Sequence, residues 1–315
     1  MLKEGNRMAT DILGIGKLGM ALLDKLGQAC AYIHKPHQIK RIAKAEKEAM
    51  DLILKDSPEG TSIEINGDNI IVKSLFNDEY LETKLAQMIC QEFKKQENID
   101  TIIGKTIEIL SSEDDNNEVN LDEEWIWNFM ECCKFVSDDE MQTIWANILA
   151  QESISNGKYS LRTLNFLKNM RKEEALLFTK VAKNTFNWLD NRVLLNSDEC
   201  ISLYEITTYD IMKLDDLGLV NDSGKALHVE PNSCINFSKS GKVYKYHNKE
   251  NKINSISVIV FTSIGNELFN LVSEERLFND DELKKIFRTS PDRKLTLHEK
   301  DGQFKHFVNP IREIE

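Results

Sequence analysis

Four acidic residues near the middle of the chain carry the oxygen ligands that divalent metal ions prefer. Asp138, Asp139 and Glu140 are consecutive, and Glu152 follows after one short stretch. If these carboxylates converged on one ion, they would form the centre of a metal-dependent nuclease. The first three equally suit the start of a helix, where acidic side chains cap backbone N–H groups and favour the helix dipole. We therefore assign no metal ligand, cofactor or catalytic residue, and the nuclease is kept as an alternative.

Glu152 and Arg162 lie near the ends of two expected helices that a short loop joins. Two opposite charges in these positions are expected to form an ion pair across the loop. Such pairs are more often structural than catalytic, so we predict a structural ion pair between Glu152 and Arg162.

Two groups of basic residues could bind an acidic partner. The first lies on an expected helix and consists of Lys35, Lys40, Arg41, Lys44 and Lys47. It is either a solvated face or a contact for lipid head groups, nucleic acid or an acidic protein. The second lies in an expected hairpin, where it could touch phosphates, and consists of Lys239, Lys242 and Lys245.

The overall charge limits what these basic groups can do. The chain has a net charge of −12, which argues against non-specific binding to nucleic acid or an anionic membrane by the chain as a whole. Residues 1–55 nevertheless carry a net +4, so a basic segment adjoins an acidic body. The six cysteines show no C-x-x-C spacing and are not grouped with histidines, which predicts reduced thiols in a cytoplasmic protein.

Helical spacing of apolar residues dominates the first two thirds of the chain. It predicts helices over residues 12–54 (with a break at Pro36), 77–110, 122–135, 138–151, 160–169 and 172–189. Ser137 and Glu140 have the spacing of a capping box for the helix that follows them. Asn66-Gly67, between two apolar runs, predicts a β-hairpin.

The last third mixes helices and strands. A helix over 209–217 ends at Gly218, two strands over 233–246 and 254–261 flank a polar turn, and helices follow over 263–272 and 281–288. This order is typical of a winged helix. We thus expect a mainly α protein with a smaller α+β part. Its segments are a basic amphipathic helical segment (1–56), a hairpin plus long helix (57–112), a central helical domain (120–190) and a winged-helix-like α+β domain (194–315).

The N-terminal helix carries an apolar stripe with no neighbouring element to cover it. Leu13, Leu18, Leu22 and Leu26 lie on one face, and a lone amphipathic helix is marginal in water. We therefore expect residues 10–50 to mediate homo-oligomerisation, contact with a protein partner or peripheral contact with a membrane.

Three stretches resemble one bacterial protein family. They are residues 36–46 (PHQIKRIAKAE), residues 96–103 (QENIDTII) and residues 136–152 (VSDDEMQTIWANILAQE), the last continuing into Tyr159–Lys168. Together they look like the family called domain of unknown function 2806, which implies no particular activity. Asn156-Gly157 stands where the family pattern leads us to expect Pro-Gly. More distantly, the helix with Trp145 is similar to abortive-infection proteins of phage defence.

These observations favour a non-catalytic interaction or effector protein acting in anti-phage defence. A nucleic-acid-binding protein that uses the C-terminal domain is the first alternative, and a metal-dependent nuclease is the second.

Overall fold

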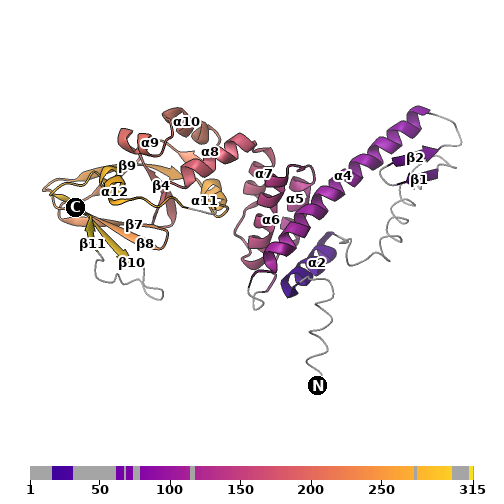
Figure 1. Cartoon of the computed structure of the whole chain (residues 1–315), viewed down its shortest axis with the longest axis horizontal. Coiled ribbons are helices and arrows are strands. Elements are labelled where there is room, and N and C mark those ends of the chain that lie inside the picture. The colour runs from indigo at the N-terminus through magenta and orange to yellow at the C-terminus, as the bar shows by residue number, and fades with distance from the viewer. Residues whose placement is uncertain are drawn as a thin grey trace, which may run out of the picture. The chain divides into compact units, whose positions relative to one another are not determined.

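The computed structural model describes residues 16–30, 62–66, 69–73, 79–113, 118–272, 275–299 and 312–314 (Figure 1). The chain divides into two compact units, residues 1–168 and residues 169–315. Within the described ranges, no helix is both long enough and apolar enough to cross a membrane.

The N-terminal unit is helical apart from one hairpin. Its elements are α2 (Lys17–Cys30), β1 (Ser62–Asn66), β2 (Asn69–Lys73), α4 (Glu79–Leu110), α5 (Glu123–Cys133), α6 (Asp139–Ile154) and α7 (Leu161–Asn169). The antiparallel pairing of β1 with β2 confirms the hairpin predicted from Asn66-Gly67. The long helix α4 packs along α6, and α2 packs against both α4 and α5.

An aromatic cluster forms the core of this unit. Trp125 stacks on Phe129 with ring centroids 5.2 Å apart, and Phe129 meets the edge of Trp145 at 5.4 Å. Rings at such offsets bury large apolar areas and add a favourable quadrupole interaction. Trp125 and Phe129, four residues apart on α5, therefore occupy inward-facing core positions, as does Trp145 on α6.

The apolar stripe of the N-terminal helix is covered within this unit. Leu18, Leu22 and Leu26 are at most 2% exposed, and α2 packs against α4 and α5. At these three positions, the apolar stripe that led us to expect a partner is therefore buried against helices of the same unit. Leu13 and the basic group formed by Lys35, Lys40, Arg41, Lys44 and Lys47 lie outside the described residues.

The C-terminal unit is built on a sheet. Its elements are α8 (Lys172–Ala182), β3 (Phe186–Trp188), β4 (Asn191–Leu195), α9 (Asp198–Leu203), α10 (Thr208–Asp216), β5 (Val220–Asn221), β6 (Ala226–Val229), β7 (Ser233–Lys239), β8 (Lys242–Asn248), β9 (Asn254–Phe261), α11 (Ser263–Phe269), α12 (Asp280–Phe287), β10 (Arg293–Glu299) and β11 (Arg312–Ile314). The strand order is β11-β10-β8-β7-β3-β4-β9-β5, with β6 also paired to β9.

The expected fold class, with its winged-helix-like C-terminal domain, is wrong. A nine-stranded antiparallel sheet stands where a winged-helix-like α+β domain was predicted. Two local errors contributed. The helix over 172–189 ends at Ala182, and a tight hairpin follows in which Leu189 has a φ of 52°. The single strand over 233–246 is two strands joined by Ser240 and Gly241, both at positive φ, as a type I′ turn requires.

Aromatic side chains fill the inner face of this sheet. The Phe186 ring lies 5.4 Å from Phe287, 5.6 Å from Phe278 and 5.7 Å from Tyr244, measured between centroids. Because side chains alternate along a strand, Phe237 and Lys239 on β7 point to this same face. A lysine side chain therefore lies among the aromatic rings of the core.

Candidate functional site

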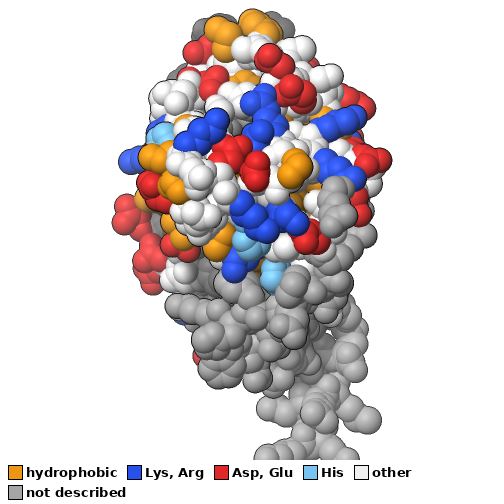
Figure 2. All heavy atoms as spheres, turned by 90° about the vertical axis from the view of Figure 1, so that its left-hand side faces the viewer, with side chains coloured by type: hydrophobic (Ala, Val, Ile, Leu, Met, Phe, Trp, Pro, Cys, Tyr) orange, Lys and Arg blue, Asp and Glu red, His pale blue; other side chains and the backbone are white. Residues whose placement is uncertain are grey.

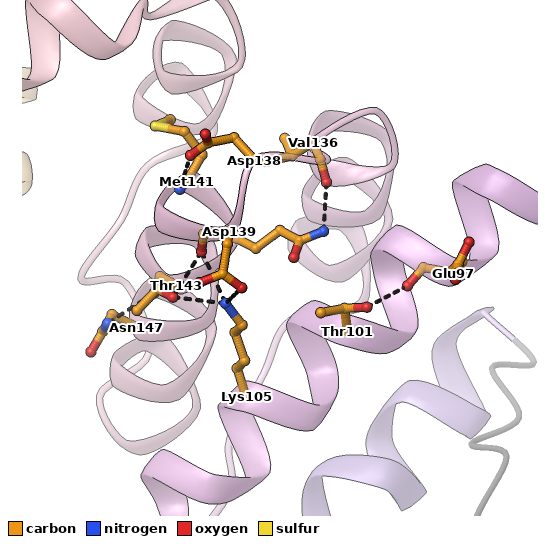
Figure 3. Close-up of polar contacts among 10 residues, drawn as sticks. Glu97, Thr101, Lys105, Val136, Asp138, Asp139, Met141, Thr143 and Asn147 are labelled. Atoms are coloured by element: carbon orange, nitrogen blue, oxygen red, sulfur yellow. Dashed lines mark hydrogen bonds and ion pairs between the residues drawn. The ribbon is translucent and has the colours of Figure 1, made fainter.

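The loop between α5 and α6, residues 134–138, is fixed by hydrogen bonds on both sides of one aromatic residue. Asn98 on α4 donates from Nδ2 to the carbonyl of Lys134 at 3.0 Å. Gln142 on α6 donates from Nε2 to the carbonyl of Val136 at 2.9 Å (Figure 3). Phe135 lies between these two fixed carbonyls, and it is 62% exposed. The loop thus holds a large apolar side chain in solvent on a constrained backbone.

Acidic residues at the start of α6 anchor the other end of this loop. Asp138 is the N-cap and accepts from the Met141 backbone N–H at 3.0 Å, one position later than the capping box expected from Ser137. Lys105 on α4 donates to the Asp139 carboxylate at 2.6 Å, to its carbonyl at 2.9 Å and to the Thr143 hydroxyl at 2.9 Å (Figure 3). These contacts join α4 to the start of α6.

Two ammonium groups flank the exposed ring. Lys95 Nζ lies 5.4 Å and Lys134 Nζ 5.5 Å from the centroid of Phe135, distances at which a cation is attracted to a ring face. Each lysine is also held by a carboxylate one turn earlier, Lys134 by Glu131 at 2.6 Å and Lys95 by Glu92. Both cations are therefore positioned before any partner arrives.

A second exposed aromatic residue lies on α5 itself. Trp127 is 53% exposed, and Glu131 and Lys134 follow at helical spacing on its face. Seven residues separate Trp127 from Lys134, or about 10 Å along the helix. We call the group formed by Lys95, Trp127, Glu131, Lys134 and Phe135 the aromatic surface. Its side chains can make apolar and ionic contacts.

Glu152 is completely buried and fixes the loop between α6 and α7. Its Oε1 accepts from the Gly157 N–H at 2.5 Å, and its Oε2 accepts from the Tyr159 N–H at 2.8 Å. Arg162, predicted as its ionic partner, is exposed. Two backbone N–H groups of this loop therefore bind the carboxylate.

The candidate metal ligands do not lie together. Asp139 opens α6 and Glu152 lies near its other end, thirteen residues or about 20 Å along the axis. In the ranges that the structure describes, no three His, Cys, Asp or Glu side chains are grouped as a metal ion would require. Asp138 and Asp139 serve the helix start instead.

The three lysines predicted to touch nucleic acid do not form one surface. Lys239 is 2% exposed, and its Nζ donates to the carbonyls of Lys183 at 2.7 Å and Thr185 at 2.8 Å. Burial lowers the pKa of Lys239 to about 8. Lys242 pairs directly with it across the hairpin, whereas Lys245, three residues along β8, points to the opposite face.

The surface charge around this sheet is mixed. Figure 2 shows Lys and Arg side chains interspersed with Asp and Glu over one end of the C-terminal unit. Proteins that bind single-stranded nucleic acid on a sheet stack bases on outward-facing aromatic rings. Here Phe237, Tyr244 and Tyr246 are at most 3% exposed on the inner face. The face drawn in Figure 2 therefore has no uniform basic patch, and these three strand positions offer no stacking platform.

A family model matches residues 85–281, described as protein of unknown function (DUF2806). The chain belongs to this family. The match confirms the resemblance seen in residues 96–103 and 136–152, and it includes the whole aromatic surface of this DUF2806 chain. No curated protein and no solved structure matches the chain.

Sequence reasoning missed the aromatic surface because it placed Phe135 at the end of a helix over 122–135. The helix ends at Cys133, and Lys134 is its C-cap. A usable signal was present: Phe135 is the last residue of the expected helix, two residues before the polar start of the next helix at Ser137. Trp127 likewise falls outside the inward stripe of α5, which contains Trp125, Ile126, Phe129 and Met130.

Proposed function

We propose that this DUF2806 protein is an interaction protein without catalysis of its own, and that a partner protein binds at the aromatic surface. The observation that carries the proposal is the presentation of Phe135: 62% of the residue is exposed although hydrogen bonds fix the carbonyls on both sides of it. Binding to a preorganised side chain avoids much of the entropy cost of ordering a loop.

The side chains of the aromatic surface favour a protein partner. Tryptophan and other aromatic residues supply much of the binding energy at protein interfaces. Lys95 and Lys134 beside Phe135 favour a partner with an apolar recess bordered by carboxylates. Nucleic-acid binding, the alternative, has less support because Lys239 is buried and Lys242 and Lys245 point to opposite faces.

Comparative copurification from native cells tests the proposal. The tagged full chain is compared with a Trp127→Ser/Phe135→Ser double variant and with Leu189→Ser, which changes a 74% exposed residue in the other unit. We expect at least one protein to be recovered with the wild type and Leu189→Ser, and to fall at least tenfold with the double variant. Equal recovery by all three folded chains would refute the proposal.

We further propose, on the distant similarity to abortive-infection proteins, that this interaction serves phage defence. Phage plating on cells with the gene, without it and with the double variant tests this step. Protection should require both the gene and the aromatic surface. Unchanged plating across a broad phage panel would remove the defence role and leave the interaction to be judged by copurification.

Self-association or peripheral membrane contact through residues 10–50 stays a prediction. The argument for it is weaker than the sequence suggested, because Leu18, Leu22 and Leu26 are buried within the chain. Light scattering and liposome flotation of the full chain test it, and a monomer that does not float would contradict it.

A further inference from the structure

A small polar cavity lies in the C-terminal unit, where the start of β9 meets the ends of α12 and β8. Its volume is about 110 Å³. Its polar wall includes Ser197, Tyr246, Asn254, Ser255, Arg288 and Arg293, and Cys200 and Phe287 contribute to its more apolar lining. Pockets for drug-sized ligands occupy roughly 300–1,000 Å³. This cavity therefore fits a single small group.

Two arginines contribute to the wall from different elements. Arg288 follows α12 in a left-handed conformation with a φ of 48°, which is uncommon for a residue with a side chain. Arg293 begins β10, and its side chain is 31% exposed, against 57% for Arg288. A non-glycine residue in this conformation persists only where its surroundings hold it. The fold thus holds the backbone of Arg288 beside the cavity at some conformational cost.

A carboxylate contacts one nitrogen of each guanidinium group and so orients it. Glu199 accepts from Arg288 Nη2 at 2.8 Å, and Glu250 lies 3.2 Å from Arg293 Nε. The hydrogen bond from Arg288 lowers the pKa of Glu199 to about 2, so this pair stays ionised at physiological pH. An arginine has five N–H donors in a rigid fork. The contact with Glu199 engages one nitrogen of Arg288, and Arg293 Nε, besides its contact with Glu250, also donates to the Ser290 hydroxyl at 3.3 Å. Further donors remain for a ligand in the cavity.

Tyr246 adds a hydroxyl donor. Its oxygen accepts from Asn254 Nδ2 and from Arg293. Burial raises the pKa of this phenol, and the two contacts offset part of that rise, so the group stays protonated at neutral pH. With its oxygen engaged as an acceptor, the Tyr246 hydroxyl can donate its own proton to a ligand oxygen. Ser255, on the same wall, bonds through Oγ to His228 Nδ1 at 2.9 Å. Arginine forks and hydroxyl donors in a space of this size match an anion with several acceptor oxygens.

We propose that this cavity binds a phosphate group between Arg288 and Arg293. The group is either free phosphate or the phosphate of a small monoester, whose remaining atoms would extend from the cavity into solvent. The site is separate from the aromatic surface and belongs to the other unit.

Titration calorimetry of the full chain tests the site, with sodium chloride and acetate at matched ionic strength as controls. The probes are inorganic phosphate and glycerol 3-phosphate, so tighter binding of one identifies the source of the group. We expect either probe to bind, and Arg293→Gln and Arg288→Gln each to weaken binding at least tenfold, since a hydrogen bond to a charged group contributes about that factor or more. The matched control Arg162→Gln changes an exposed arginine in the other unit and should bind as the wild type does.

Circular dichroism shows whether each variant is folded, and the largely exposed Arg288 provides the substitution least able to disturb the fold. Failure of the wild type to bind either probe at millimolar concentration would overturn the proposal. Binding of equal strength in Arg288→Gln, Arg293→Gln and Arg162→Gln would overturn it as well, because the anion would then lie elsewhere.

Discussion

Replacing Glu152 should destabilise the N-terminal unit far more than replacing an exposed carboxylate of the same unit. Its two oxygens accept from the Gly157 and Tyr159 N–H groups, and its side chain is completely buried. A hydrogen bond to a charged group contributes about 1.5–3 kcal/mol net, so Glu152→Ala should cost roughly 3–5 kcal/mol. Domains are typically stable by about 5–15 kcal/mol, which makes this a large fraction. Glu152→Gln keeps the shape and one acceptor, so about half that loss is expected.

Urea unfolding followed by tryptophan fluorescence measures this loss, since Trp125 and Trp145 are buried in the same unit. Hydrogen exchange locates it, because the Gly157 and Tyr159 amides should lose protection first. Glu108→Ala is the matched control: Glu108 is exposed on α4 and should change stability by about 0.5 kcal/mol at most. If Glu152→Ala unfolds within about 1 kcal/mol of the wild type, the carboxylate does not hold this loop and the reasoning fails.

Three further predictions concern single contacts. Burial lowers the pKa of Lys239 from 10.5 to about 8. Between these two pH values the unfolded chain keeps a proton on Lys239 that the folded chain has lost. The free energy of unfolding should therefore rise with pH across this window, by up to about 3 kcal/mol. Urea titrations of wild type and Lys239→Met across this window should show that slope in the wild type only. Gly265→Ala would place a Cβ 2.1 Å from the Leu219 carbonyl oxygen. This clash should lower the free energy of unfolding by roughly 3 kcal/mol, which thermal unfolding measures. Lys105→Met removes a partly exposed salt bridge to Asp139. It should lower the free energy of unfolding, measured in urea, by about 1 kcal/mol or less.

The helices of the N-terminal unit were predictable because their signals are local. Trp145, Ile148 and Leu149 recur at helical spacing in the segment that forms α6, and Asn66-Gly67 is a direct signal for a hairpin turn. The sheet was not predictable in the same way. The hairpin of β3 and β4 turns at Leu189, a residue that gives no turn signal, and β10 pairs with β8 about fifty residues earlier in the chain. Such long-range pairing depends on tertiary packing that a local pattern does not contain.

The placement of the candidate site residues could not be predicted for the same reason. Lys239, Lys242 and Lys245 form a group in sequence, but the register of β7 with β8 decides which face each one occupies. That register follows from the turn at Ser240-Gly241, which lies in the middle of the single strand expected over 233–246. The presentation of Phe135 depends on hydrogen bonds from Asn98 and Gln142, which belong to two other helices and leave no local pattern around the loop.

Site-specific photo-crosslinking tests the interaction surface most directly. A benzoylphenylalanine residue replaces Phe135 in the full chain, and a second chain carries it in place of Leu189, which is similarly exposed in the other unit. After irradiation of living cells, we predict a discrete crosslinked adduct of a partner protein from position 135 and none of that mass from position 189. The adduct should weaken when Trp127→Ser is added. No adduct from position 135, or the same adducts from both positions, would contradict the assignment of the aromatic surface as the binding site.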